Sequence, residues 1–411
     1  MLASRRTSLL DTKPMPHASD RPLLRLLPNQ GRRLRAGAPW VFSNEIAMRP
    51  EYRKLEPGGL VRLEGGDGTR FGTFIFNPHS LIALRLLDRD PDVMIDAAWL
   101  RARLTSAIDL RARVCDSPFH RLVHAEADGL PGLVIDRYGD VAVLAANTAG
   151  MDRLTPLIVE VLRELLPLRA IVGRNDAAAR RQEGLEESVS LLHGTDATAV
   201  VEEGGVRFPV DLLGGQKTGW FFDQRPNRDR VAALARGGRV LDVFCHTGAF
   251  GLRCISGGAT SAMLLDSSAP ALVRATEAAR LNGWSDRITT ERGDAFAGMT
   301  ELAASAERFD IVVCDPPAFA RSRKDAEAGL RAYGRMARLA APLVAPGGFL
   351  LVASCSHHTP LDAWAAQIGW GLHRARREAR ILATTGAGAD HPVHPHLPET
   401  TYLKAQLLQL R

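Results

Sequence analysis

Five side chains able to do chemistry stand at the ends of successive expected strands, or directly after them, in the second half of the chain. Four are carboxylates and one is a thiol: Asp242, Asp266, Asp294, Asp315 and Cys355. In an open sheet of parallel strands, ligands bind outside the carboxyl ends of the strands, so such groups would line one site. Carboxylates accept hydrogen bonds from hydroxyl and amino groups, and a thiolate is a nucleophile. The combination indicates a nucleoside-like ligand held beside a reacting group.

The first three acids favour an adenosyl ligand without phosphates. Asp242 precedes the turn "CHTGAFG", in which Gly248 would let the backbone approach a ligand and a helix start would offer free N–H groups. Asp266 follows near the offset at which an acid reaches ribose hydroxyls, and Asp294 is placed to accept from an adenine amino group. A phosphate-bearing cofactor would call for a P-loop or a GxGxxG turn, and neither stands here.

The last two groups favour a flat heterocycle as the second ligand. In "CDPPAF", two prolines stiffen the backbone after Asp315, and Phe319 offers a face for stacking. A proline turn with a packed phenylalanine is the structural alternative. Cys355 ends the next apolar segment in "SCSHH", where a thiolate would touch the same ring.

Residues 201–411 must position these groups, and their alternating strands and helices predict an α/β fold with an open parallel sheet covered on both faces. The expected strands are 239–244, 262–266, 287–291, 309–315 and 348–354, with one more in the final "TTYLKAQLLQL". The expected helices include 270–282 and 331–344.

The first half of the chain predicts two smaller domains. Residues 21–95 hold short strands separated by Gly and Pro, which is typical of a β-rich domain. Residues 96–200 mix helical periodicity at 97–114 and 152–165 with strands at 132–138 and 141–147, which predicts an α+β connector domain. Residues 1–20 are polar and aperiodic, so we expect a disordered tail, with an organellar presequence as the alternative.

Clustered arginines stand near the start of the β-rich domain, in "GRRLRAGAPW". Arg32 and Arg33 could grip phosphates while Trp40 stacks on a base. A tryptophan packed beneath a solvated arginine stripe explains the same residues, and both interpretations stay open.

Composition is typical of a globular intracellular enzyme. The 411 residues are 45% apolar and 6% aromatic, which suits two to three domains. No apolar stretch approaches the roughly 20 residues of a membrane span, so we expect a cytoplasmic location and no membrane partner. Five cysteines without CxxC spacing predict free thiols and no metal site. A net charge of +6 favours a nucleic-acid partner, while the oligomeric state is undetermined and a homodimer stays open.

Several motifs are similar to those of one enzyme family. They are "PWVFSNEI", "EADGLPGLVIDRYGD", "QKTGWFFDQRPNR", "DVFCHTGAFG", "CDPPAF", "SCS" and "DHPVHPHLPETTYLK". Over nearly everything after residue 20, the chain resembles the class I S-adenosylmethionine-dependent methyltransferases. Within that class it resembles the bacterial large-subunit rRNA cytosine-C5 methyltransferases of the RlmI type.

The resemblance implies a PUA domain, a connector domain and a C-terminal Rossmann-like methyltransferase domain. It also implies S-adenosylmethionine as cofactor and RNA, here 23S rRNA, as partner. By the resemblance, Asp315 and Cys355 are the catalytic pair. The implied cofactor-binding residues are Gln224, Arg225, Asp242, Thr247, Gly248, Asp266 and Asp294.

The chain departs from the family on the RNA side. The family often has Lys directly after the double proline and another in the following helix, where this chain has Ala318 and Gly334. Positive charges that could compensate follow the loop: Arg321, Arg323 and Lys324.

The resemblance points to a covalent mechanism. Carbon 5 of cytosine is a poor nucleophile until a thiolate adds to C6, which Cys355 would do while Asp315 stabilises the charge at N3. His357 and His358 could assist the thiol, although solvated loop histidines are the simpler interpretation. Two other functions stay open. One is methylation of an exocyclic amine or ring nitrogen of RNA, which needs no cysteine, and the other is a non-catalytic RNA-binding ribosome assembly factor.

Overall fold

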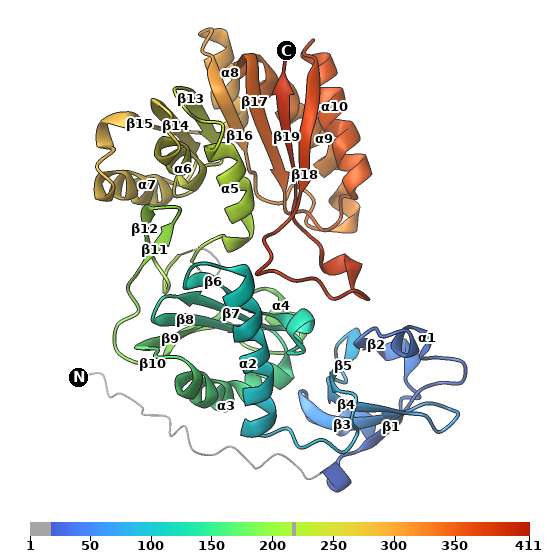
Figure 1. Ribbon diagram of the computed structural model, residues 1–411. Helices are drawn as coiled ribbons and strands as arrows, with labels where there is room; N and C mark the ends of the chain where they lie inside the picture. Colours follow the sequence, from blue (N-terminus) through green and yellow to red (C-terminus); the bar gives the residue numbers. More distant parts are fainter. Residues whose placement is uncertain (1–17, 216–218) are drawn as a thin grey trace, which may run out of the picture. The chain divides into compact units, whose positions relative to one another are not determined.

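The computed structural model describes residues 18–215 and 219–411 (Figure 1). Residues 1–17 of the expected disordered tail lie outside that range, and residues 18–20 form a short 3-10 turn. The chain divides into two compact units. The first holds residues up to 199 with 211–220 and 394–397, and the second holds 200–210, 221–393 and 398–411. The expected domain limits 21–95, 96–200 and 201–411 stay predictions.

The first unit begins with a five-stranded sheet in the order β1-β3-β4-β5-β2. Alternate residues of a strand face the same side, and Val61, Leu63, Phe74 and Phe76 accordingly share one apolar core. The expected β-rich domain is confirmed. Its elements are β1 (Leu23–Arg25), α1 (Arg32–Arg35), β2 (Trp40–Phe42), β3 (Gly59–Glu64), β4 (Arg70–Phe76) and β5 (Ile82–Asp88).

The first unit continues with a second sheet, in the order β10-β9-β8-β7-β6, against which two long helices pack. Helix α2 spans the residues expected from its periodicity, and its N-cap Asp96 accepts a hydrogen bond from the Trp99 N–H. The elements are α2 (Ala97–Val114), β6 (Phe119–His124), β7 (Leu133–Tyr138), β8 (Val141–Ala146), α3 (Ala149–Leu165), β9 (Ala170–Asn175), α4 (Ala179–Gln182) and β10 (Ser188–His193).

The second unit is built on a seven-stranded sheet in the order β15-β14-β13-β16-β17-β19-β18 (Figure 1). A two-stranded sheet of β11 (Ala199–Glu203) and β12 (Val206–Val210) precedes it. The strands are β13 (Arg239–Val243), β14 (Ser261–Asp266), β15 (Ile288–Arg292), β16 (Phe309–Cys314), β17 (Val344–Ser354), β18 (Ala379–Thr385) and β19 (Lys404–Leu410). The helices are α5 (Arg225–Ala232), α6 (Ala249–Ser256), α7 (Ala269–Leu281), α8 (Ala295–Ala304), α9 (Ala326–Ala340) and α10 (Leu361–Arg374).

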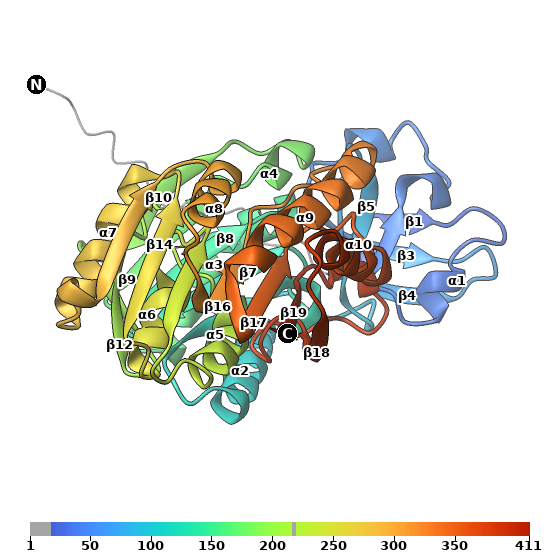
Figure 2. The ribbon, with the colours of Figure 1, turned by 90° about the horizontal axis from the view of Figure 1, so that it is seen from above.

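Helices cover both faces of this sheet because its central strands are apolar on both sides. Leu241, Val243 and Val352 pack with α8, α9 and α10 in one core. Val240 and Leu351, their neighbours in sequence, pack with α5, α6 and α7 in the other. The two layers can be followed in Figure 2, and they confirm the predicted α/β fold.

The sheet departs from the expected all-parallel arrangement at one edge. Strand β19 is antiparallel to both of its neighbours, β17 and β18. Strand β18 was not expected at all, because Ile381 and Leu382 are exposed and its sequence lacks a buried apolar run. After β17 the chain first forms β18 at the outside of the sheet, and then returns as β19 between β17 and β18.

Two glycines let helices α9 and α10 pack very closely. A Cβ at Gly371 would stand 2.3 Å from the backbone oxygen of Gly334, and a Cβ at Gly334 would stand 2.9 Å from Oε1 of Gln367. Gly334 is the position at which the resemblance predicts a lysine. A longer side chain at this position would have to displace the Gln367 side chain and would press against the Gln367 backbone oxygen, 3.1 Å from the Cβ position. Among the described residues, no helix is long and apolar enough to cross a membrane.

We predict that Gly371→Ala lowers the free energy of unfolding by about 1–3 kcal/mol, because the added methyl meets backbone rather than a flexible side chain. Gly369→Ala is the matched control on the same helix, since a Cβ there meets nothing within 4 Å. The control should stabilise by up to about 1 kcal/mol through helix propensity. Thermal unfolding of both variants measures this, and equal effects would contradict the proposed close packing.

Candidate active site

The five groups singled out from the sequence lie at the end of the second unit's sheet where its parallel strands finish, which we call the sheet edge. Strands β15, β14, β13, β16 and β17 are mutually parallel, so their carboxyl ends meet there. Asp242 and Asp266 lie at the ends of β13 and β14, and Asp315 and Cys355 directly follow β16 and β17. Asp294 follows β15 as the N-cap of α8, where its Oδ1 accepts from the Ala297 N–H at 2.9 Å.

The turn after β13 has an unusual backbone. Phe244, His246 and Gly248 have φ of 61°, 50° and 73°, a region that L side chains rarely adopt. Asp266 holds this turn, because its Oδ2 accepts from the His246 N–H at 2.8 Å and its Oδ1 from the Ser268 N–H at 2.8 Å. Each carboxylate oxygen keeps a second lone pair for a ligand hydroxyl. Sequence reasoning had not found the role of Asp266 in holding the turn.

Asp242 is a buried carboxyl at the start of α6. Its Oδ2 accepts from the Gly251 N–H at 2.9 Å, while its Oδ1 has no hydrogen-bond partner among the described residues. Burial raises the pKa of Asp242 to about 7; the Gly251 N–H opposes the rise, and Asp315 and Asp266 add to it. A cationic ligand group at Oδ1 would stabilise the carboxylate.

Gly248 and Thr247 complete the same turn. Gly248 is the left-handed N-cap of α6, and a Cβ there would stand 2.9 Å from a methyl of Leu264. Thr247 is buried. Gln224 is also buried and its Oε1 accepts from the Asn227 side chain, whereas Arg225 lies 3.6 Å from a Glu203 oxygen. The last two therefore face protein partners.

Phe319 belongs to an aromatic cluster beneath the Asp315 loop. Its ring centroid lies 4.7 Å from that of Tyr333, 5.9 Å from Phe296 and 6.2 Å from Phe244. Part of the ring is therefore packed, as the structural alternative held, and the side chain stays half-buried.

Cys355 differs from the other cysteines of the second unit. Cys245, Cys254 and Cys314 are buried, and burial raises the pKa of each thiol. Cys355 is only half-buried at the sheet edge. His357 beside it is exposed, and its Nδ1 lies 3.4 Å from the Glu399 carbonyl oxygen.

Sequence reasoning missed two polar residues under the Cys355 turn. Tyr333 lies on α9 and Lys404 begins β19, and both are buried. Tyr333 gave no local signal, since it looks like one more apolar residue of an amphipathic helix. Lys404 did give one, because a lone charge opening the apolar run "AQLLQL" is unusual inside a covered sheet.

The residues proposed to contact RNA lie on exposed segments or pack locally. Arg32 and Arg33 are exposed on α1, and the Arg33 guanidinium lies 5.3 Å from the Phe42 ring centroid. Arg321 is exposed after Phe319. The Trp40 indole N–H donates to Glu126 at 2.9 Å, and Arg85 covers its ring. This geometry favours the packed interpretation of Trp40.

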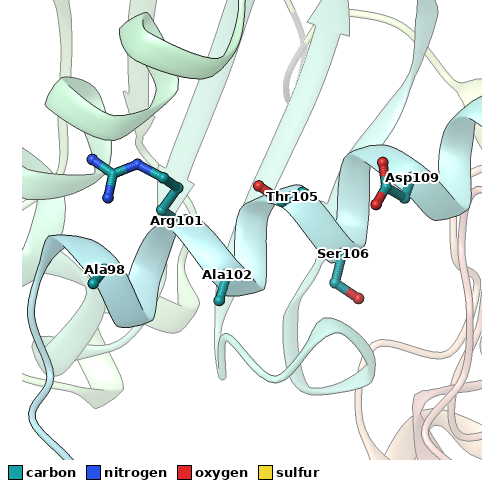
Figure 3. Close-up of a pocket in the computed structure, with 6 residues that line it drawn as sticks. All are labelled: Ala98, Arg101, Ala102, Thr105, Ser106 and Asp109. Atoms are coloured by element: carbon teal, nitrogen blue, oxygen red, sulfur yellow. The ribbon is translucent and has the colours of Figure 1, made fainter.

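A shallow hollow on the first unit does not resemble an active site. Its lining residues all lie along α2 (Figure 3): Ala98, Arg101, Ala102, Thr105, Ser106 and Asp109. Arg101 there pairs with Glu164.

In the described parts of the chain, no three His, Cys, Asp or Glu side chains gather as a metal site would require.

The sheet-edge residues fit S-adenosylmethionine. The partnerless oxygen of Asp242 suits the ammonium of its methionine part, and Asp266 has lone pairs left for hydroxyls. The absence of a Cβ at Gly248 lets this turn pack directly against Leu264 and Ala275, which fixes its position next to the two acids.

Comparisons with known proteins agree with this fit. Residues 180–409 match the family described as S-adenosylmethionine-dependent methyltransferase, and residues 24–89 match a PUA-like domain. A Shewanella denitrificans protein named ribosomal RNA large subunit methyltransferase I is 34% identical over 387 residues, which cover 93% of this chain and 97% of that protein. A protein of the same name from Aeromonas salmonicida is 36% identical over 380 residues, covering 91% and 95%.

Solved structures share the fold. One, from Streptococcus mutans, has a TM-score of 0.78 at 20% identity and covers 94% of this chain and 100% of that one. Another, complexed with SAH, has a TM-score of 0.79 at 20% identity and covers 95% and 99%. Fold and family model thus define an S-adenosylmethionine-dependent methyltransferase with a PUA-like domain. Within that class, the chain belongs to the family of the ribosomal RNA large subunit methyltransferase I proteins.

We predict that cofactor affinity rises about tenfold between about pH 6 and pH 8, as Asp242 with its pKa of about 7 becomes charged. Asp242→Asn should bind the cofactor more weakly and lose this pH dependence.

The same group should affect stability. Because the folded pKa of Asp242 lies above the unfolded one, wild-type stability falls as pH rises from about 4 through 7, and the variant should escape that loss. Calorimetry and thermal unfolding measure the two effects. A wild-type affinity that does not change with pH would contradict the proposed contact.

Proposed function

We propose that this protein methylates carbon 5 of a cytosine in large-subunit (23S) ribosomal RNA through a covalent bond between Cys355 and C6. The observation that carries the proposal is the half-buried Cys355 at the same sheet edge as the fitted cofactor acids. The names of the relatives support large-subunit rRNA as the substrate.

In this proposal the cofactor residues divide the ligand among them. Asp242, Thr247 and Gly248 hold the methionine end, Asp266 the ribose and Asp294 the adenine. Gln224 and Arg225 shape the cofactor site indirectly, because both side chains contact other residues of the protein. When bound, S-adenosylmethionine supplies the methyl group.

The proposed reaction has three steps: addition of the thiolate, methyl transfer and elimination. The Cys355 thiolate forms the S–C6 bond, and the C5–C6 π electrons move through C4 to N3, where a proton from the Asp315 carboxyl neutralises the charge. Carbon 5 then forms a bond to the methyl group as the N3 proton returns to Asp315, and the bond between that methyl and the donor sulfur would break to leave a neutral thioether. Loss of the C5 proton to a base returns an electron pair that breaks the S–C6 bond and releases the thiolate.

We predict that wild-type protein with cofactor forms a covalent adduct with RNA containing 5-fluorocytidine, because fluorine leaves no C5 proton to remove. The adduct should survive denaturing gel electrophoresis, and Cys355→Ser should abolish it while keeping cofactor affinity. Cys245→Ser is the control. Its thiol lies in the turn after β13, beside the proposed cofactor site, so this variant should still form the adduct.

Three results would overturn the assignment. An adduct that persists in Cys355→Ser but disappears in Cys245→Ser or Cys314→Ser would move the nucleophile. No adduct in any variant, together with methylated nucleosides in normal RNA, would favour an exocyclic amine or ring nitrogen. Cofactor binding without any methylation would favour the assembly factor.

We also propose that the PUA-like domain and the loop after Phe319 contact the RNA. Arg32, Arg33 and Arg321 are exposed and carry the charge, and Phe319 supplies what remains of its ring face. Trp40 would contact RNA through the ring face opposite Arg85, since Arg85 stands over one face and the indole N–H is bonded to Glu126.

We predict that the double variant Arg32→Ala, Arg33→Ala lowers the slope of log affinity against log salt by about 2, one unit for each phosphate that is no longer neutralised. The control Arg53→Ala, Lys54→Ala removes the same charge from exposed residues of the same domain. Filter binding over a salt series separates the two, and equal slopes in both variants would show a general charge effect only.

A further inference from the structure

A buried ammonium lies under the turn that carries Cys355. Lys404 is 9% exposed, and it pairs with Ser354 across β17 and β19. Its Nζ donates to the Ser356 carbonyl at 2.8 Å, and to Thr359 Oγ1 and the Tyr402 carbonyl at 3.4 Å each. The ammonium therefore binds the residue directly after the cysteine.

All of these partners are neutral. No carboxylate in the described part of the chain pairs with Lys404, and burial lowers the pKa of its ammonium. The interaction that opposes this effect comes from Cys355, whose thiolate raises the pKa of Lys404. Interaction energies between two charges are reciprocal, so a positive Lys404 favours the thiolate to the same extent.

The other side of the turn is fixed by Tyr333. The Ser354 hydroxyl donates to the Tyr333 oxygen at 2.8 Å, and the Tyr333 and Ser356 hydroxyls lie 2.9 Å apart. Ser356 Oγ also accepts from the Ala320 N–H at 3.3 Å, which joins the turn to the Asp315 loop. Both neighbours of Cys355 are thus held by buried groups.

We propose that Lys404 is a positioning residue for the nucleophile, which fixes the Cys355 turn and stabilises the thiolate form of Cys355. The inference rests on the proposed function, in which that thiolate adds to the base. The thiol proton leaves to water, and Lys404 keeps its own proton throughout.

Other titratable groups surround the pair. Tyr333 faces it from α9, and burial raises the pKa of Tyr333, so its hydroxyl is neutral at physiological pH. Tyr402 and His357 lie on the flanking segments with ring centroids 5.5 Å apart, and Asp315 ends the neighbouring strand. Among these, Lys404 is the buried cation.

The test is the pH dependence of Cys355 alkylation by iodoacetamide in the full-length protein without RNA, followed by peptide mass spectrometry. The wild-type midpoint should lie below the ordinary value of about 8.5 for a free thiol. Lys404→Met should raise the midpoint by about one pH unit or more, a tenfold loss of thiolate at neutral pH. Lys324→Met removes the same charge from an exposed 3-10 turn and should leave the midpoint unchanged.

Tyr333→Phe separates charge from shape, because it loosens the turn without changing any charge. Its midpoint should stay at the wild-type value, and a shift equal to that of Lys404→Met would overturn the electrostatic assignment. If Lys404→Met fails to fold, the wild-type midpoint decides, and a value at or above about 8.5 overturns the proposal.

The adduct assay distinguishes this inference from the function beneath it. A lowered midpoint without any 5-fluorocytidine adduct would refute the proposed function and leave the thiolate assignment standing. An adduct formed by a thiol with an ordinary midpoint would refute the role of Lys404 and leave the function standing.

Discussion

The turn after β13 is the constraint on which the rest of the site depends. Its left-handed residues Phe244 and His246 are held by Asp266 from the next strand. The fixed turn directs the Phe244 ring into the aromatic cluster, where Phe319 and Tyr333 follow. Tyr333 in turn bonds the two serines beside Cys355. A continuous set of packed rings and hydrogen bonds thus runs from the cofactor side of the edge to the thiol.

Charge divides the same edge into two halves. The strands on one side end in Asp242, Asp266 and Asp294, which suit a cationic, hydroxyl-bearing cofactor. Asp315 stands between the two halves, after β16, and the turn after β17 has Lys404 beneath it, which suits an anion. Because the two halves favour opposite charges, a cationic methyl donor and a thiolate can be held in neighbouring places without competing for the same groups.

Much of this was readable from the sequence, for a physical reason. Strands buried on both faces are nearly continuous apolar runs, so their ends, and the acids standing there, could be located. The orientation of β19 and the existence of β18 could not, since β18 is an exposed edge with Ile381 in solvent. The roles of Lys404 and Tyr333 could not be predicted from the sequence, because their hydrogen-bond partners lie 48 and 23 residues away along the chain. The packing of Trp40 depends on Glu126 and Arg85, which no local pattern reveals.

The contact between α9 and α10 also limits how this enzyme can be redesigned. Because Gly334 faces Gln367 and Gly371 faces the Gly334 oxygen, the two positions share one small volume. A lysine placed at 334 would have to displace the Gln367 side chain and would press against the Gln367 backbone oxygen, 3.1 Å from the Cβ position. The introduction of a charge at 334 therefore depends on how far Gln367 can give way, whereas the exposed segment around Arg321 offers a place for a basic residue outside the core.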